Sequence, residues 1–129
     1  MTKDFVPYEQ ALALKKLGFD EHCFGRWLII TEWEAPTGEI RLQLGAEAES
    51  YDKNQCTAPL YQQAFRWFRE KYGLDSIVQP TYSPKYQYRM FHIEGKTKVQ
   101  IYGDYMGKEF NTYEEAELEC LKKLIKTKQ

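Results

Sequence analysis

The segment TAPLYQQAFRWFREKYGL, residues 57–74, constrains the fold more than any other part of the sequence. At 100° per residue its apolar residues fall within one arc of a helix, and Gln62 and both arginines fall on the other side. Gly73 followed by Leu74 is typical of a helix C-terminal cap with its hydrophobic contact. An amphipathic helix is therefore predicted over about 58–72, with its aromatic arc in the core. The arc consists of Leu60, Tyr61, Ala64, Phe65, Trp67, Phe68 and Tyr72.

Two other segments carry the start and stop signals of helices. Pro7 is favoured in a first helical turn, and Gly18 is favoured just past a helix end. Thr112 and Glu115 fit a capping box, in which the hydroxyl accepts from the Glu115 amide and the carboxylate accepts from the Thr112 amide. Glutamates early and lysines late in this second segment match the helix dipole. Helices are therefore predicted over about 7–17 and 113–126.

Runs of β-branched and aromatic residues predict strands. Pro36 and Gly38 in APTG suit a type I turn, and EGK at 94–96 suits a second hairpin. The polar segment 45–56 is aperiodic and is expected to be an exposed loop. The order α-β-β-α-β-β-β-α predicts an α+β fold, a single domain over 1–129 with an antiparallel sheet of four to five strands and about three helices. The expected strands lie in RWLIITEWE (26–34), EIRLQLG (39–45), SIVQ (76–79), YQYRMFHI (86–93) and TKVQIYG (97–103).

The charge balance excludes one large class of partners. With 18 basic and 19 acidic residues the net charge is -1, so no general positive field draws in a nucleic acid backbone. The opening MTKDFVPYEQ lacks the apolar core of a signal peptide, and no apolar run reaches the ~20 residues that span a bilayer. We therefore expect a soluble cytoplasmic protein, in the host cytoplasm if a phage encodes it, without membrane association or general DNA binding.

The sequence carries no recognisable motif of catalysis, metal binding or cofactor binding. Cys23, Cys56 and Cys120 lack the C-x-x-C spacing and predict free, reduced thiols, and no motif supports a Cys–His nucleophile pair. The metal-ligating residue types at 20–23 are consecutive and do not converge on one ion. YGDYMGKEF, 102–110, is one spacer short of a phosphate loop and has an acidic residue where the hydroxyl should stand, so it predicts an ordinary glycine turn.

Two arginines of the amphipathic helix are the first candidate binding residues. Arg66 and Arg69 lie three residues apart and share a face with Gln62. Together they can hold a phosphate, a carboxylate or an acidic partner surface. The alternative is a solvated face, because most surface charges contribute little.

The strand at 86–93 supplies the other candidates, because its side chains alternate between two faces. Phe91 and Ile93 favour burial of one face. The other face is then expected to expose tyrosines and His92, either as a stacking platform for a planar ligand or as cross-strand pairs that stabilise the sheet. The face expected to be exposed carries Tyr86, Tyr88, Met90 and His92, and the opposite face carries Gln87, Arg89, Phe91 and Ile93.

Three segments, FVPYEQALALKKLGFDEHCFG, APLYQQAFRWFREKYGL and FNTYEEAELECLKKLIK, resemble a group of small proteins from phages and mobile elements of gut anaerobes. They cover somewhat under half of the chain, and the pieces QQAFRWFREKYGL and TYEEAELECLKKLI are the specific ones. The resemblance implies a phage-like origin, with counter-defence as a context. It brings no activity, ligand or site residue with it.

We therefore expect a binding module rather than an enzyme. In one hypothesis the tyrosines of the strand stack a nucleobase, while Arg89, or Arg66 and Arg69, neutralise its phosphate. In the other, the face of Arg66 and Arg69 and the loop at 45–56 dock on a host or phage protein or on a second copy of the chain. A small enzyme acting on a nucleotide is the third alternative.

Overall fold

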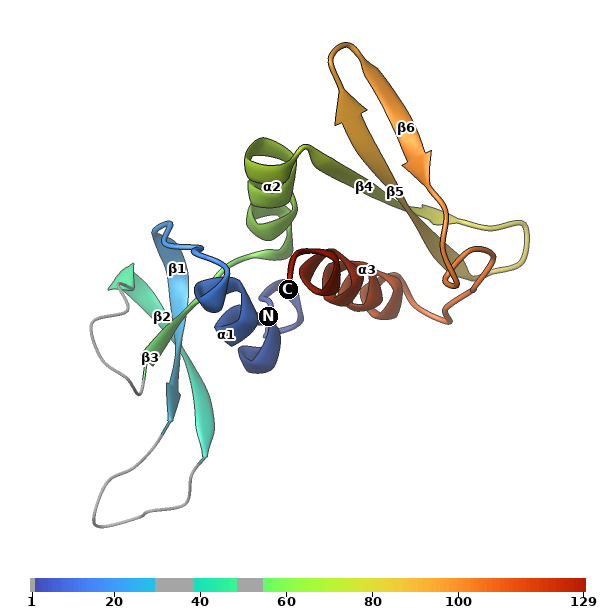
Figure 1. Cartoon of the computed structure of the whole chain (residues 1–129). Helices are drawn as coiled ribbons and strands as arrows, with labels where there is room; N and C mark the ends of the chain where they lie inside the picture. Colours follow the sequence, from blue (N-terminus) through green and yellow to red (C-terminus); the bar gives the residue numbers. More distant parts are fainter. Residues whose placement is uncertain (1, 30–38, 49–54) are drawn as a thin grey trace. The chain divides into compact units, whose positions relative to one another are not determined.

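The computed structural model describes residues 2–29, 39–48 and 55–129, and the chain divides into two compact units, Met1–Tyr61 and Gln62–Gln129. The described residues form three α-helices and six strands in two three-stranded antiparallel sheets (Figure 1). The helical elements are η1 (Thr2–Asp4, a 3-10 turn), α1 (Tyr8–Lys16), α2 (Tyr61–Tyr72) and α3 (Tyr113–Lys128). The strands are β1 (Cys23–Ile29), β2 (Ile40–Ala48), β3 (Gln55–Ala58), β4 (Leu74–Pro80), β5 (Tyr86–Glu94) and β6 (Thr97–Ile101).

The α+β class, the three helices and the antiparallel pairing are confirmed, but the number of sheets differs from the expectation. The strands form two sheets rather than one of four to five strands, and β3 adds a strand to the expected order. Of the expected loop at 45–56, residues 45–48 belong to β2 and 55–56 to β3, while the rest lies outside the described residues, as does the expected APTG turn. β3 is a short strand that pairs with β1, and a contact between distant segments of this kind is not predicted by a local sequence pattern.

In the first unit the strand order is β2-β1-β3, and α1 packs against β3. The indole nitrogen of Trp27 on β1 donates to the carbonyl of Val6 at 2.9 Å, which ties the N-terminal segment to the sheet. The predicted stop of α1 at Gly18 is confirmed, because this glycine has φ 105. Its amide donates to Lys15, and the amide of Phe19 donates to Leu14, both at 3.0 Å, which is the hydrogen-bond pattern of a Schellman cap.

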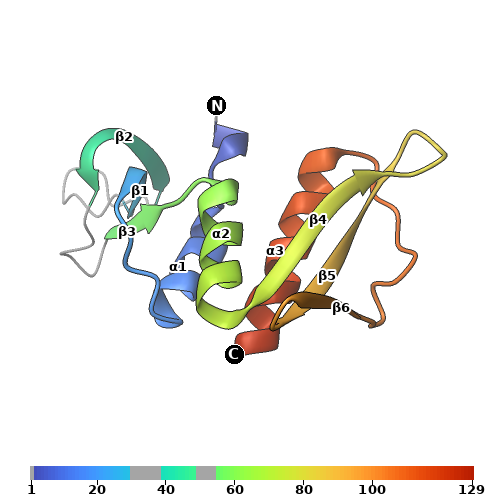
Figure 2. The same cartoon turned by 90° about the horizontal axis from the view of Figure 1, so that it is seen from above.

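In the second unit α3 lies against one face of the β4-β5-β6 sheet, as both ribbon views show (Figures 1 and 2). Cys120, Leu121 and Leu124 of α3 are fully buried. The predicted hairpin through EGK is confirmed, since Glu94 pairs with Thr97 and Gly95 between them has φ 61. The hydroxyl half of the predicted capping box is present as well, because Thr112 accepts from the Glu115 amide at 3.1 Å.

The amphipathic helix is confirmed as α2, and its two faces are as predicted. It begins at Tyr61 rather than near residue 58, because Ala58 belongs to β3. Trp67 and Phe68 are buried, and their rings meet edge to face with centroids 5.1 Å apart. Arg66 and Arg69 are exposed. Gly73, with φ 65, ends the helix, and the buried Leu74 follows it.

Replacing Trp67 should therefore affect stability far more than replacing the arginines on the other face of α2. We expect Trp67→Ala to lower the free energy of unfolding by ~3–5 kcal/mol, through lost burial and a cavity. Arg66→Ala and Arg69→Ala should each change it by only ~0.5 kcal/mol, as surface substitutions do. Denaturant-induced unfolding of the three variants measures the difference. An arginine variant as unstable as Trp67→Ala would contradict the outward orientation.

The N-cap of α3 gives a second stability prediction. Thr112→Ala should lower the free energy of unfolding by about 1 kcal/mol, because the Glu115 amide loses its acceptor. Thr112→Ser keeps a hydroxyl at the same position and serves as the matched control. Thermal unfolding of both variants and the parent measures the difference in stability. If Thr112→Ser lost as much stability as Thr112→Ala, the lost methyl group and not the cap would be responsible.

Candidate functional site

The tyrosine face of β5 is the buried one, which corrects the expectation from sequence. Tyr88 is 7% and Met90 1% exposed, because α3 packs on this face. Phe91 and Ile93, expected in the core, lie half-buried on the opposite face. Alternation separates the two sets of side chains correctly, but it does not decide which set faces the helix.

Tyr88 is unavailable as a stacking platform. Its ring stacks on Tyr105, with centroids 4.8 Å apart, and packs nearly parallel to Phe110 at 6.1 Å. Burial raises the pKa of the Tyr88 hydroxyl. Tyr86 is half-buried and packs edge to face on Tyr113, with centroids 5.8 Å apart. The tyrosines therefore pack against α3 and the segment that precedes it. These contacts are not the cross-strand pairs of the alternative expectation, because Tyr105, Phe110 and Tyr113 lie outside β4 and β6.

The remaining predicted residues do not join the tyrosines in one site. His92 lies on the tyrosine face but is exposed, and Arg89 lies on the opposite face of β5. Arg69 is directed toward β4, where its guanidinium lies 3.8 Å from the carboxylate of Asp75. Lys98 on β6 holds the same carboxylate at 2.6 Å. Asp75 and Arg89 lie on the same face of the sheet, so the sheet separates Arg69 and Arg89 from the tyrosines.

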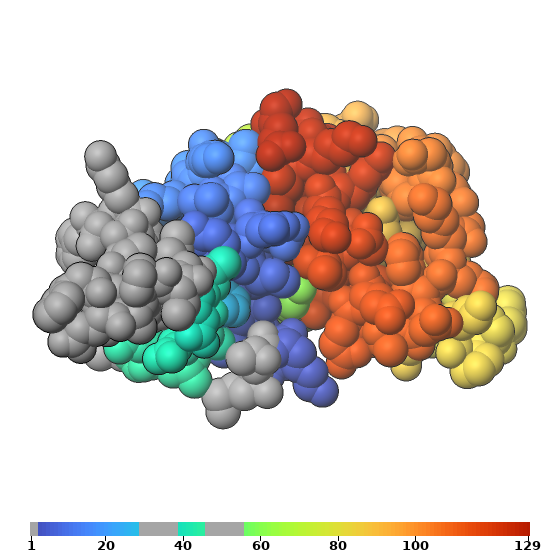
Figure 3. All heavy atoms as spheres, turned by 90° about the horizontal axis from the view of Figure 1, so that it is seen from below, coloured from blue at the N-terminus to red at the C-terminus, as the bar shows by residue number. Residues whose placement is uncertain are grey.

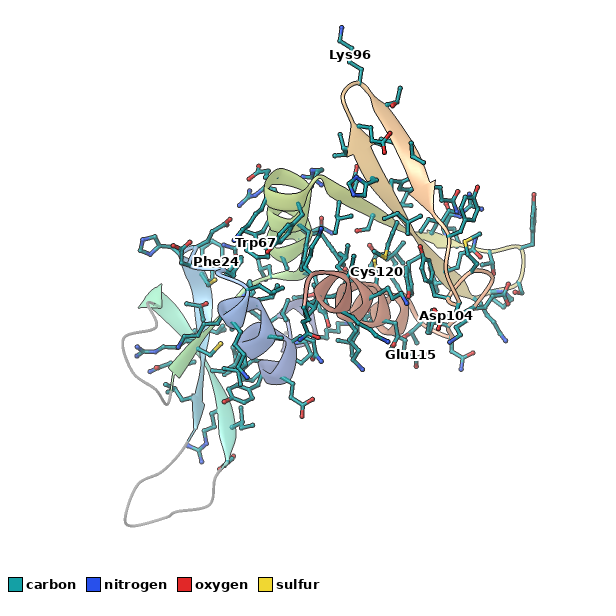
Figure 4. The ribbon with its side chains drawn as sticks, in the orientation of Figure 1. Phe24, Trp67, Lys96, Asp104, Glu115 and Cys120 are labelled. Carbon is teal, nitrogen blue, oxygen red and sulfur yellow. The ribbon has the colours of Figure 1, made fainter. Side chains whose placement is uncertain are left out.

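A pocket of about 220 Å³ lies within the second unit, and we call it the lysine-rimmed pocket. Its floor is the aromatic group already described, made of Tyr88, Tyr105 and Phe110. In the space-filling view of one face, the atoms of α3 adjoin those of the segment that follows β6 (Figure 3). Asp104 lies on that segment, and the side chain of Cys120 on α3 is directed toward the sheet (Figure 4). The charged residues of the pocket are Lys108, Lys122, Lys123, Lys126, Asp104 and Glu119.

The segment between β6 and α3 builds one wall of this pocket by local turn chemistry. The amide of Met106 donates to Gly103 at 3.1 Å, and the amide of Lys108 donates to Tyr105 at 3.0 Å. A Cβ on Gly103 would lie 2.9 Å from the Tyr105 ring, so this position has no room for a side chain. Gly107 has φ 81, a conformation that glycine adopts at little cost. The predicted glycine turn is therefore confirmed.

The lysines of the pocket differ in how they are neutralised. Lys123 bonds Asp104 at 3.1 Å, and Lys122 bonds Glu119 at 3.2 Å. Within the part of the chain that the structure describes, the ammonium groups of Lys108 and Lys126 form no hydrogen bond or ion pair. Four cations thus meet two anions, and the pocket has a net charge of +2.

The electrostatics of the pocket shift the pKa values of Asp104 and Tyr105 away from neutrality. The hydrogen bond and the charge of Lys123 lower the pKa of Asp104, and the charges of Lys108 and Lys126 act in the same direction. Burial raises the pKa of Tyr105, whose hydroxyl donates to the carbonyl of Ile101. Near neutral pH the carboxyl is therefore ionised and the buried phenol is neutral.

The sequence does not predict this pocket, because its lining residues come from separate segments. The late lysines of α3 were assigned to the helix dipole, and the segment 102–110 was assigned to a turn. The available signal was the spacing of Lys122 and Lys126, which puts both on one helix face. Nothing in the sequence shows that this face adjoins Lys108.

A second, open hollow of about 730 Å³ contains one of the predicted site residues. Its lining includes Arg89 and, on the neighbouring strand, Gln79. The fully exposed ring of Tyr82 and the carboxylate of Glu109 also border it. Among the described residues, Arg89 forms no ion pair. We call this hollow the Arg89 groove.

The cysteines are placed as structural residues. All three are free, as predicted, and all three are buried. Burial raises the pKa of the Cys56 thiol, and it raises that of Cys120 to about 12. These two thiols are therefore protonated at neutral pH and are poor nucleophiles. No group of three or more potential metal ligands was found among the described residues.

Comparison with protein-family models, with curated proteins and with solved structures finds no match for this chain. None of the described helices is long and apolar enough to cross a membrane. The chemistry of the candidate sites must therefore be argued from their own residues.

The ion pairs of Asp75 give a pH prediction. Partial burial acts to raise its pKa, but the hydrogen bonds from Lys98 and Ser76 and the charges of Lys98 and Arg69 outweigh this and lower it from 3.8. Because the folded-state pKa is depressed, the stabilisation is complete above about pH 4 and is lost as pH falls through the folded-state value.

Unfolding free energies measured between about pH 5 and pH 3 should therefore fall less steeply for Asp75→Asn than for the parent. Asp20→Asn, an exposed change of the same charge, is the control and should keep the parental slope. If Asp75→Asn and the parent had equal slopes, the carboxylate would not be stabilised by these ion pairs.

Proposed function

We propose that this chain is a non-catalytic binding protein for a phosphorylated small molecule, and that the lysine-rimmed pocket holds the phosphate end. The main support is the gathering of four lysines and two carboxylates around a buried aromatic floor. Lysine is a common phosphate ligand, acting as a compact point charge with rotatable donors. The two lysines without an ion pair come from different segments, Lys108 before α3 and Lys126 within it, so they can approach an anion from two directions.

The protonation states of the pocket favour binding over acid–base chemistry. A general acid or base works best with a pKa near the operating pH. The pKa shifts of three groups in this pocket run the other way, since the pKa of Asp104 is lowered and those of Tyr88 and Tyr105 are raised. Each group is thereby held more firmly in one protonation state at neutral pH.

A nucleotide is the ligand class that fits the resemblance to phage proteins, since sequestering a nucleotide signal would serve counter-defence. The nucleobase would not stack on Tyr88, which is buried in the floor. It would extend beyond the pocket, whose 220 Å³ is below the roughly 300–1,000 Å³ of pockets that enclose a whole drug-sized ligand.

The second candidate function is docking of a protein partner, and the Arg89 groove favours it. A guanidinium without an ion pair beside a fully exposed aromatic ring is the pairing of residue types that protein interfaces concentrate. The partner in this alternative is a host or phage protein, or a second copy of the chain. Arg89→Ala with Tyr82→Ala would then abolish a stoichiometric complex while leaving anion binding unchanged.

The primary proposal predicts stabilisation by polyphosphates. Inorganic pyrophosphate and nucleoside diphosphates should raise the melting temperature, because a ligand of the folded state stabilises it by mass action. The double variant Lys108→Ala/Lys126→Ala should lose about tenfold or more in affinity, since it removes two charge-assisted contacts. Ligand recovered after denaturing the protein should be chemically intact.

Lys96→Ala is the matched control, because Lys96 lies at the tip of the β5–β6 hairpin, directed away from the rest of the sheet (Figure 4). It removes the same charge and should retain parental affinity. If Lys96→Ala lowered the affinity for the ligand as much as the double variant does, the loss would reflect the net charge of the protein and not contacts in the pocket. Conversion of the ligand would overturn the non-catalytic proposal.

A further inference from the structure

We infer that the lysine-rimmed pocket selects a terminal phosphate dianion, the end of a phosphomonoester or diphosphate, over a phosphodiester, and that Asp104 is the internal counterion with which the ligand competes. This inference rests on the proposed function and names its ligand class. Three observations carry it: the charge that the pocket leaves unneutralised, the buried aromatic rings on one side, and the exposed ion pair of Asp104.

The charge requirement follows from the ion pairs. Each carboxylate of the pocket neutralises one lysine, Asp104 with Lys123 and Glu119 with Lys122. The ammonium groups of Lys108 and Lys126 are not neutralised by these carboxylates, so a ligand with two negative charges balances them. A phosphomonoester carries about −1.5 to −2 charge at pH 7, whereas a diester carries a single charge and leaves one lysine unneutralised.

The shape of the pocket favours a chain end over a chain interior. The stacked and buried rings of Tyr88 and Tyr105 form the floor, and Phe110 packs beside them. A terminal phosphate can enter such a pocket with its three unesterified oxygens directed at the lysines. An internal phosphodiester would have to lead its chain both in and out above the same floor, with only two unesterified oxygens to accept hydrogen bonds.

Asp104 is placed to set the strength of binding. Its side chain is 82% exposed, so its bond to Lys123 is an accessible ion pair of a kind that contributes little to stability. The ammonium of Lys123 also lies 5.6 Å from the centre of the Tyr105 ring, which keeps it over the floor when the carboxylate is displaced. A bound phosphate can therefore take over Lys123, and Asp104 opposes this exchange.

The test compares two ligands that differ in one ester bond. Phenyl phosphate and methyl phenyl phosphate are titrated into the full chain by calorimetry or by NMR chemical shifts, at about pH 7.5 and about pH 5. The second pKa of a phosphomonoester is near 6, so phenyl phosphate is mostly a dianion at the higher pH and mostly a monoanion at the lower one. We therefore expect phenyl phosphate to bind at least about tenfold tighter than methyl phenyl phosphate at about pH 7.5. Most of this difference between the two ligands should disappear at about pH 5.

Asp104→Asn supplies the second measurement. It should tighten binding of phenyl phosphate by about threefold to tenfold, because Lys123 no longer has a competing anion. Asp20→Asn is the control of equal charge, on an exposed residue that does not line the pocket, and should leave the affinity unchanged.

Failure of this inference and failure of the proposed function give different results. Equal affinity for the two esters at the higher pH, weakened by Lys108→Ala/Lys126→Ala, would overturn dianion selection but keep the pocket as an anion site. Weaker or unchanged binding in Asp104→Asn would overturn the counterion role. Absence of binding by both esters and by pyrophosphate would overturn the proposed function itself.

Discussion

Tyr88 of β5 packs its ring on Tyr105 at 4.8 Å and lies nearly parallel to Phe110 at 6.1 Å, and these contacts join the sheet to the segment that leads into α3. The backbone reinforces them, because Tyr86 and Phe110 exchange hydrogen bonds of 2.9 and 2.7 Å. Offset aromatic contacts of this kind add to the stabilisation that burial itself provides. With this segment fixed, Lys108 adjoins the lysines of α3, and the lysine-rimmed pocket exists.

The same contacts give the aromatic and the charged residues of the pocket different roles. The tyrosines expected to stack on a planar ligand pack in the core instead, so the proposed recognition of a ligand rests on the charged residues of the pocket. Those charges are held in definite states, with Asp104 ionised beside Lys123. A pocket of this composition is suited to holding an anion and poorly suited to moving a proton, which unites the proposed function with the inferred preference for a dianion.

Local sequence signals account for the parts of the fold that depend on neighbouring residues. The cap at Thr112, the stop at Gly18 and the apolar arc containing Trp67 all act within one or two helical turns, and the structure contains each of them. The strand β3 escaped prediction because its four residues, Gln55–Ala58, follow a polar segment and are too short a run to be distinguished from a loop by pattern. Pairing with β1, from Gly25 with Ala58 to Leu28 with Gln55, is what makes it a strand.

The sequence by itself determined which side chains share a face, because the periods of helix and strand are properties of the local backbone. It separated Tyr88 from Arg89 on β5 and Trp67 from Arg66 on α2. Only the tertiary structure decided which face of β5 is buried, because that depends on where α3 packs. It also decided where the lysine-rimmed pocket lies, since Lys108 and Lys126 belong to separate local segments and line one pocket only in the folded chain.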